Sequence, residues 1–165
     1  MAVIGTPIKK HLNFLFLDTA PGESAEAWKR VGTATDFAHA MNAETEAFDY
    51  IADENPTEEL KSYKPTLAQT QAAHVGDPIY DFVFRLYKTQ ATGGDAVTKA
   101  MIVYQQKVST EEDAGNEAIQ FNALITIDTY DFVAKTITYT ISQRGTPVHG
   151  SAKVVDEKPT FTPAA

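Results

Sequence analysis

The sequence contains no cysteine among its 165 residues, which excludes disulfide bonds and thiolate metal sites. It also has little continuous apolar sequence near its start, where the run from Leu12 to Leu17 is interrupted by Asn13. Such a run is too short to span a membrane, and no small-residue cleavage pattern follows it. We therefore expect a soluble protein that is not secreted and has no membrane partner.

Positive charge is scarce as well. The chain has 14 Lys and Arg against 22 Asp and Glu, a formal net charge of -8, and no Lys or Arg lies between Val31 and Leu60. Proteins that grip nucleic acid do so with clustered Lys and Arg. The composition therefore argues against a nucleic-acid-binding surface, and it suits a surface that must not adhere to a polyanion.

Catalytic and ligand-binding motifs are missing. The four histidines have no spacing typical of a metal site, no serine lies in a GxSxG-like setting, and Gly93-Gly94-Asp95 is better read as a turn than as a phosphate loop. The carboxylate pairs could in principle bind calcium or act as acid and base, but a solvated acidic loop explains them more simply. We expect no enzyme activity, no metal and no cofactor.

The clearest periodic pattern predicts a helix from Asp77 to about Lys88. Asp77 is a favourable N-cap, Pro78 suits the first helical position, and Arg85 and Lys88 complement the carboxyl end of the helix dipole. The apolar stripe of this predicted core helix consists of Ile79, Phe82, Val83, Leu86 and Tyr87. One helix with a single apolar face needs a sheet to cover.

Alternating apolar and polar residues predict that sheet. We expect strands at residues 12–18, 27–31, 43–52, 60–72, 98–106, 118–128 and 135–142, a polar loop at 107–116 and a turn at the DTYD sequence, residues 128–131. Pro65 would be tolerated in the 60–72 strand only at an edge or a bulge. The acidic segment 53–59 follows Ala52 and contains the turn signal Asn55-Pro56, so we expect a solvated loop there.

Uncharged polar residues share one face of two neighbouring predicted strands. They are Gln120, Asn122, Thr126, Thr136, Thr138 and Thr140, and they alternate with apolar residues that could pack on the helix. The fold class is therefore mainly β with one flanking helix. We expect a single domain over residues 1–165, with an N-terminal arm at about 1–22 and a flexible C-terminal tail at about 156–165.

Several segments, in this order, resemble a known family. The sequences WKRVG, ETEAFDYIADE, KSYKPTL, GDPIYDFVFRLYK, TGGDAVTKAMIVYQ and ITYTISQRGTPVHGSAKVV are similar to segments of the major tail tube proteins of tailed bacteriophages and related prophage tails. The resemblance covers roughly residues 28–155. It rests on the order of the segments and on the chain length.

The resemblance implies an antiparallel β-sandwich or half-barrel with a flanking helix. Six copies would form a ring, and stacked rings would enclose the channel for DNA ejection. It implies partners as well: a tape measure protein, a tail terminator and baseplate or distal tail proteins, in a virion tail assembled in the bacterial cytoplasm. The six uncharged polar residues become candidates for the lumen wall. Candidates for contacts between rings are Asp49, Asp53, Glu54, Glu58 and Glu59.

Two other hypotheses stay open. One is a tube subunit of a bacterial secretion or tailocin-like machine, which shares the tube architecture. The other is a monomeric ligand-binding β-barrel, which predicts an apolar interior along every strand.

Overall fold

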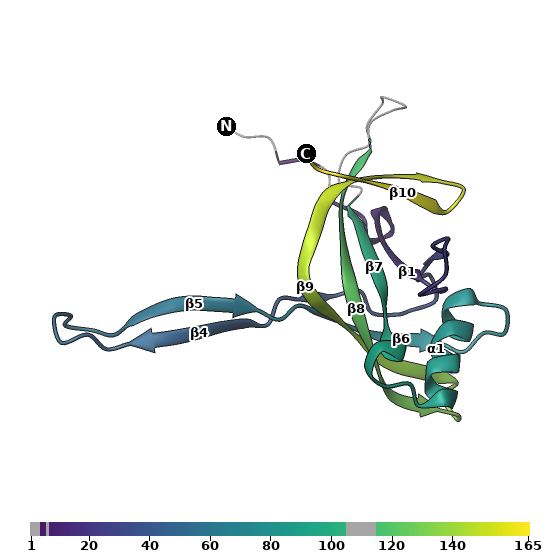
Figure 1. The fold of residues 1–165 in the computed structure, drawn as a ribbon, viewed down its shortest axis with the longest axis horizontal. Coiled ribbons are helices and arrows are strands. Elements are labelled where there is room, and N and C mark those ends of the chain that lie inside the picture. Colours follow the sequence, from purple (N-terminus) through teal and green to yellow (C-terminus); the bar gives the residue numbers. More distant parts are fainter. Residues whose placement is uncertain (1–3, 6, 105–114) are drawn as a thin grey trace.

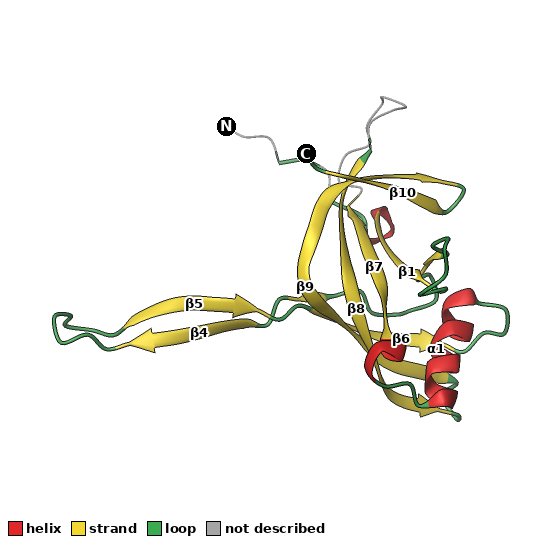
Figure 2. Ribbon diagram, in the orientation of Figure 1, coloured by secondary structure: helices red, strands yellow, loops and turns green. Residues whose placement is uncertain are grey.

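The computed structural model describes residues 4–5, 7–104 and 115–165. Most of the described chain is β-strand, with a single α-helix and two short 3-10 turns (Figure 2). The elements are η1 (Lys10–Leu12), β1 (Asn13–Asp18), β2 (Trp28–Arg30), β3 (His39–Ala40), β4 (Ala43–Phe48), β5 (Thr57–Tyr63), β6 (Thr66–Ala72), α1 (Pro78–Thr89), η2 (Gly93–Ala96), β7 (Val97–Tyr104), β8 (Asn116–Asp131), β9 (Thr136–Val155) and β10 (Lys158–Pro163).

One antiparallel sheet forms the body of the molecule, in the order β2-β1-β7-β8-β9-β6-β3, with β10 paired to β9 (Figure 1). The two long strands at its centre, β8 and β9, pair from Asn116 to Asp131. Their register shifts between Gln120 and Asn122 and again between Ile127 and Thr129. Such irregularities increase the local bend of a sheet, and the body is accordingly curved. The predicted mainly β, antiparallel half-barrel with one flanking helix is confirmed.

The helix forms where its sequence signals predict it. The Asp77 carboxylate accepts hydrogen bonds from the amides of Ile79 and Tyr80, Pro78 is the first helical residue, and the helix ends at Gln90 with a left-handed backbone. Ile79, Phe82, Val83 and Leu86 of the predicted stripe are buried, and Tyr87 is partly buried against the same core.

The main core lies between α1 and one face of the sheet. Leu15 and Leu17 of β1, Ile102 of β7, Phe121 of β8 and Tyr139 of β9 contribute to it. A smaller second core lies on the other face, around Phe16, Met101, Val103, Ala118 and Ala152, where the partly buried Trp28 and Phe161 pack against it. The curved sheet therefore buries apolar side chains on both faces.

The segment between β2 and β3 crosses the helix side of the sheet. The Val31 amide donates to the Leu15 carbonyl at 2.8 Å, and the Thr35 amide donates to the Thr70 carbonyl at 2.9 Å. The segment thus connects β1 to β6, and with α1 it closes the concave side of the half-barrel.

Several boundary predictions were wrong, and the strand expected at 135–142 continues as β9 to Val155. The strand expected at 43–52 ends at Phe48, and β5 begins at Thr57, so Glu58 and Glu59 lie in a strand and not in the predicted acidic loop. The strand expected at 60–72 is two strands, because Lys64 and Pro65 interrupt it between β5 and β6. The DTYD sequence belongs to β8, and the turn follows it at residues 132–135.

The C-terminal tail is also corrected. Residues 158–163 form β10, which pairs with β9 from Val155 to Gly150, although the segment was expected to be flexible. Pro159 and Pro163 are compatible with this strand because β10 lies at an edge and pairs on one side only. The loop predicted at 107–116 falls mostly outside the described residues.

Candidate functional site

The most exposed part of the fold is the hairpin of β4 and β5, which forms a two-stranded sheet of its own (Figure 1). Its strands pair from Ala43 opposite Tyr63 to Phe48 opposite Thr57. Every residue of the two strands is exposed except Phe48 and Ser62, which are half-buried. An isolated two-stranded hairpin is at best marginally stable in water. A hairpin that projects in this way therefore offers both of its faces for contacts with other molecules.

The hairpin strands hold each other through polar contacts. Lys61 pairs with Glu46 at 3.4 Å and Lys64 with Glu44 at 3.0 Å, while the Thr45 hydroxyl donates to Glu58 at 2.6 Å. The Lys64 ammonium, with help from the Ser62 hydroxyl, lowers the pKa of the Glu44 carboxyl. Exposed pairs of this kind contribute little to stability. They neutralise Glu44 and Glu46, whereas the ion pairs of the hairpin do not reach Glu58 or Glu59.

The structure divides the five ring-stacking candidates between two places. Asp49, Asp53 and Glu54 lie in the hairpin tip, residues 49–56, where the Asp53 amide donates to the Tyr50 carbonyl at 3.0 Å. Glu58 and Glu59 lie on β5, opposite Ala47 and Glu46. The sequence pattern did not single out two residues that accompany the acidic tip: Ile51 is fully exposed and Tyr50 about half exposed.

The six lumen candidates lie on the sheet face that points away from α1. Their apolar neighbours, such as Phe121, Ile125 and Tyr139, face the helix and are buried, whereas the six candidates are exposed or half-buried. The Thr138 hydroxyl donates to the Thr129 carbonyl at 3.2 Å, and the Thr140 hydroxyl donates to Asp128 at 3.0 Å. The structure therefore brings the predicted set together on one face.

Strand β6 extends this polar face. Ala68, Thr70 and Ala72 pair with Thr140, Thr138 and Thr136, so they share the face, while Gln69 and Gln71 point into the core. The alternation in TLAQTQA, the sequence of β6, indicates that its residues divide between two faces of the sheet. It does not indicate that the face with the two glutamines is the buried one. Gln71 is buried because its amide donates to Asp77 at 3.2 Å and its carbonyl accepts from Tyr139.

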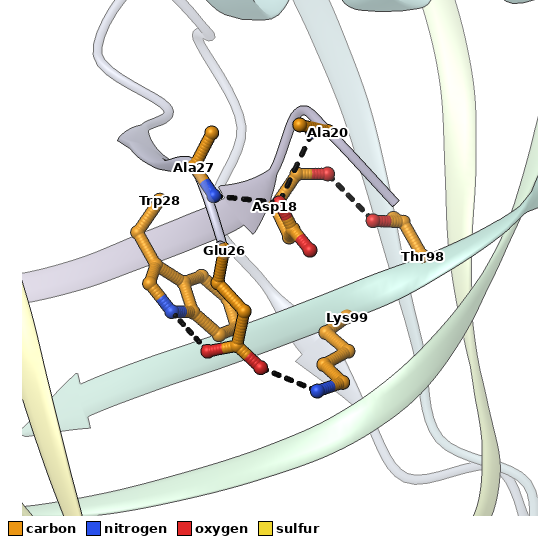
Figure 3. A network of polar contacts seen from close by, with 7 residues as sticks. All are labelled: Asp18, Ala20, Glu26, Ala27, Trp28, Thr98 and Lys99. Atoms are coloured by element: carbon orange, nitrogen blue, oxygen red, sulfur yellow. Dashed lines mark hydrogen bonds and ion pairs between the residues drawn. The ribbon is translucent and has the colours of Figure 1, made fainter. Parts of the chain in front are cut away.

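The polar face also carries charged residues, which the sequence pattern did not predict. Asn122 pairs with Lys99 on one side and with Arg144 on the other. The Lys99 ammonium contacts Glu26, whose second oxygen accepts from the Trp28 indole at 2.9 Å (Figure 3). Chiefly through its bond to Lys99, the pKa of the Glu26 carboxyl is lowered. The charge of Lys99 is therefore neutralised locally.

The loop that supplies Glu26 is fixed by Asp18 at the end of β1 (Figure 3). One carboxylate oxygen of this buried residue accepts from the amides of Ala20 and Ala27, at 3.0 and 2.9 Å. Its carbonyl accepts from the Thr98 hydroxyl at 2.5 Å. These bonds position the 19–27 loop, and hence Glu26, next to β7.

An aromatic cluster covers the outer side of α1. Its members are Tyr80, Phe84, Tyr87, Tyr130 and Phe132. The Tyr80 and Tyr130 hydroxyls lie 2.8 Å apart, and this bond raises the pKa of Tyr80 to about 12. Tyr80, Phe84 and Tyr87 recur at helical spacing, so a second apolar stripe was detectable in the sequence.

The described residues contain no arrangement of side chains typical of a metal centre. Across 4–5, 7–104 and 115–165, no group of three His, Asp or Glu side chains is arranged to hold a metal ion. In the same part of the chain, no helix is both long and apolar enough to cross a membrane.

Comparison with known proteins finds similarity in structure only. No protein-family model matches the sequence, and no curated protein matches it. The tube-terminating cap of the anti-feeding prophage superimposes with a TM-score of 0.54 over 99% of this chain and 96% of that chain, at 12% identity. The sheath/tube terminator of the PVC extracellular contractile injection system gives a TM-score of 0.54 over 90% of this chain and 100% of that chain, at 8% identity. This chain therefore shares its fold with these two proteins.

Proposed function

We propose that this chain is a structural, non-enzymatic subunit of a phage-tail-type tube, which assembles as hexameric rings that stack around a DNA channel. The observation that carries the proposal is the fold shared, over nearly the whole of both chains, with two subunits that terminate tubes. The projecting hairpin supports it, because its exposed strand edges are normally paired or covered. A closing ring of identical subunits provides such a partner for each copy.

The polar face suits a lumen wall. Thr126, Thr138 and Thr140 present hydroxyl groups that do not bind phosphates as a row of Lys or Arg would, and the net charge of -8 adds repulsion that keeps a duplex centred. Changing Thr138→Lys together with Thr140→Lys should leave the chain folded and lower DNA delivery by particles that carry it. The pair Thr89→Lys with Thr92→Lys, on the outer side, is the matched control. Undiminished infectivity of the first variant would rule out this face as the lumen wall.

The proposed partners follow from the same role. Asp49, Asp53 and Glu54 at the hairpin tip, with Glu58 and Glu59 on β5, would contact the adjacent ring. A tape measure protein would occupy the lumen before DNA does, and a terminator and baseplate or distal tail proteins would cap the two ends. The subunit would belong to the virion tail and assemble in the host cytoplasm.

A tube terminator is the second candidate, because both similar structures are terminators. A terminator makes one ring and does not polymerise. A tube subunit of a secretion or tailocin-like machine would polymerise as a phage subunit does and would differ in its cargo. A monomeric ligand-binding barrel is less well supported, since Ile79 and Val83 of α1 fill the concave side of the half-barrel with fully buried side chains.

Negative-stain microscopy of the purified chain at high concentration separates these candidates. We expect tubes built of rings roughly 100 Å across, the size that six domains of this length would give around a channel. Single rings that never stack would favour the terminator. A chain that stays monomeric at every concentration would overturn both assignments.

A further inference from the structure

Three residues form a row across the polar face of the sheet, at right angles to its strands. Lys99 of β7 pairs with Asn122 of β8, and Asn122 pairs with Arg144 of β9, so the three residues share one face. We call them the cation row. Neighbouring strands lie about 4.8 Å apart, which places the backbones at Lys99 and Arg144 roughly 10 Å from each other. Two cations on either side of an amide group form a favourable surface for a phosphate backbone.

The cation row differs from the rest of this face in its charge. Further along β9 the face carries the threonine hydroxyls, and beside them Asp128 accepts from Thr140 at 3.0 Å. Arg30 of β2 lies near the second core, where its guanidinium covers the Phe14 ring at 3.9 Å from the ring centroid. Charges about 10 Å apart still act together at moderate salt. The cation row is therefore the part of the polar face at which a polyanion would be retained.

Glu26 neutralises one end of the cation row. The Lys99 ammonium contacts one carboxylate oxygen of Glu26, and the Trp28 indole donates to the other oxygen at 2.9 Å (Figure 3). The side chains of Lys99 and Glu26 are 44% and 41% exposed. The contact with Lys99 lowers the pKa of the Glu26 carboxyl, so this group is ionised at neutral pH. Because an exposed ion pair contributes little to stability, the main effect of Glu26 is on the charge that the face presents.

The loop that supplies Glu26 is tied at both of its ends. The Thr19 amide and the Thr19 hydroxyl both donate to the Ala27 carbonyl, at 3.0 and 3.1 Å. The Thr98 hydroxyl donates to the Asp18 carbonyl, which ties the loop to β7 directly beside the residue that Glu26 contacts. The carboxylate is thus positioned by the fold, and less conformational entropy is lost when the ion pair forms.

We propose that Glu26 masks the positive charge of Lys99, so that the cation row does not retain the phosphate backbone of duplex DNA at the polar face. Glu26 takes the place beside Lys99 that a phosphate oxygen would otherwise take. This masking rests on the proposed function, which it deepens by naming a residue that keeps the face from holding DNA. In a ring of identical copies the row would recur in every subunit, so weak retention at one row would be multiplied.

Binding of a short fluorescent DNA duplex to the unassembled chain at low ionic strength tests the masking. Glu26→Gln removes the carboxylate charge and keeps an oxygen that can accept from the Trp28 indole. We expect this variant to bind the duplex roughly threefold to fivefold more tightly than the parent chain, because an exposed ion pair no longer competes for Lys99. The slope of the logarithm of the binding constant against that of the salt concentration should steepen by about 0.9, the value for one added phosphate contact.

Two further variants serve as controls. Glu23 is an exposed glutamate of the same loop, so Glu23→Gln changes the net charge equally without uncovering Lys99, and it should bind the duplex as the parent does. The double variant Glu26→Gln with Lys99→Gln has the net charge of the parent and lacks the uncovered cation, and its binding should also return to that of the parent. Circular dichroism verifies that all the variants fold.

The outcomes separate the masking from the proposed function. Unchanged binding by Glu26→Gln would overturn the masking, and so would equal tightening by Glu23→Gln, because net charge alone would explain both effects. A double variant that binds as tightly as Glu26→Gln would overturn it too, since the uncovered charge would not be that of Lys99. Duplex binding needs no rings, so the masking can fail while microscopy shows tubes. Tightening specific to Glu26→Gln supports the masking even where the absence of tubes overturns the tube assignment.

Discussion

Asp77 is the residue on which several elements of the fold meet. One of its carboxylate oxygens caps α1, accepting from the Ile79 amide at 2.9 Å, and the other accepts from the Thr33 hydroxyl at 2.5 Å and from Gln71. Gln71 in turn accepts from the buried Tyr139 hydroxyl at 2.9 Å. The side chain therefore joins the helix to β6, to β9 and to the segment that closes the half-barrel.

Replacing Asp77→Ala should lower the free energy of unfolding by about 2 to 3 kcal/mol, because it removes the helix cap and leaves buried polar partners unpaired. The measurement is urea denaturation followed by circular dichroism. Asp81→Ala is the control, since it removes the same charge from the first turn of the same helix at an exposed position, and we expect about 0.5 kcal/mol from the helix dipole. Equal losses in the two variants would contradict the role given to the network.

His39 should make the stability of the chain depend on pH. Burial lowers the pKa of its imidazole, so the unfolded chain takes up this proton more readily than the folded one. The contribution of neutral His39 to the free energy of unfolding is fully present above the ordinary pKa of about 6.5. It is lost as the pH falls through the lowered pKa of the folded state. We expect His39→Gln to reduce the fall in denaturation midpoint between about pH 7.5 and about pH 5. Exposed His149→Gln should not, and an unchanged pH profile in His39→Gln would refute the prediction.

At the scale of elements, β10 depends on a glycine opposite it. A Cβ at Gly150 would lie 2.2 Å from the Thr162 carbonyl oxygen and 2.9 Å from the Pro163 Cα, both backbone atoms. Gly150→Ala should therefore separate the end of β10 from β9 and cost about 1 to 3 kcal/mol of unfolding free energy. Hydrogen exchange of the β10 amides measures the loss. Gly94→Ala, where a Cβ meets nothing within 4 Å, should leave exchange in β10 unchanged; faster exchange there too would remove the steric explanation.

Local signals made some elements predictable from sequence. The helix expected from Asp77 to about Lys88 is Pro78–Thr89 with Asp77 as its cap, because a cap, a first-turn proline and an apolar stripe all act within a few residues. The alternation from Ala118 to Asp128 likewise placed Phe121, Ala123 and Ile125 on the core face. These features need no knowledge of what lies elsewhere in the chain.

Features that depend on distant residues were not predictable. β10 has two prolines and weak alternation, and it becomes a strand because β9 extends to Val155 and offers it an edge. Glu58 and Glu59 belong to a strand because β4 pairs with them across the tip, although their charge suggested a loop. The open groove at the base of the hairpin is lined by residues from His39 to His149, and no short stretch of sequence contains them all.

At the scale of the whole molecule, folding and proposed assembly use different parts of the chain. Both apolar cores are built from the main sheet, α1 and β10, and neither includes a residue of β4 or β5. The hairpin contacts the body through its base, where the Asn42 side chain donates to the Lys64 carbonyl and to the Thr66 hydroxyl, both at 2.9 Å. The subunit can therefore lose the hairpin without losing its cores.

Removal of the hairpin tests this division of roles. Ala43 and Tyr63 pair directly, so residues 44–62 can be replaced by an Asn-Gly turn, which favours tight hairpins. The thermal midpoint should stay within a few degrees of the parent chain, because no core contact is lost and exposed ion pairs contribute little. In the same variant, rings and tubes should be absent by microscopy at every concentration at which the parent chain assembles. A second variant, in which only residues 52–55 become a Gly-Ser turn, removes Asp53 and Glu54 but keeps Asp49 and both strands, so it should assemble less readily than the parent chain and more readily than the variant without the hairpin. If the variant without the hairpin assembles as the parent does, the contacts between copies lie on the body and the hairpin has another role.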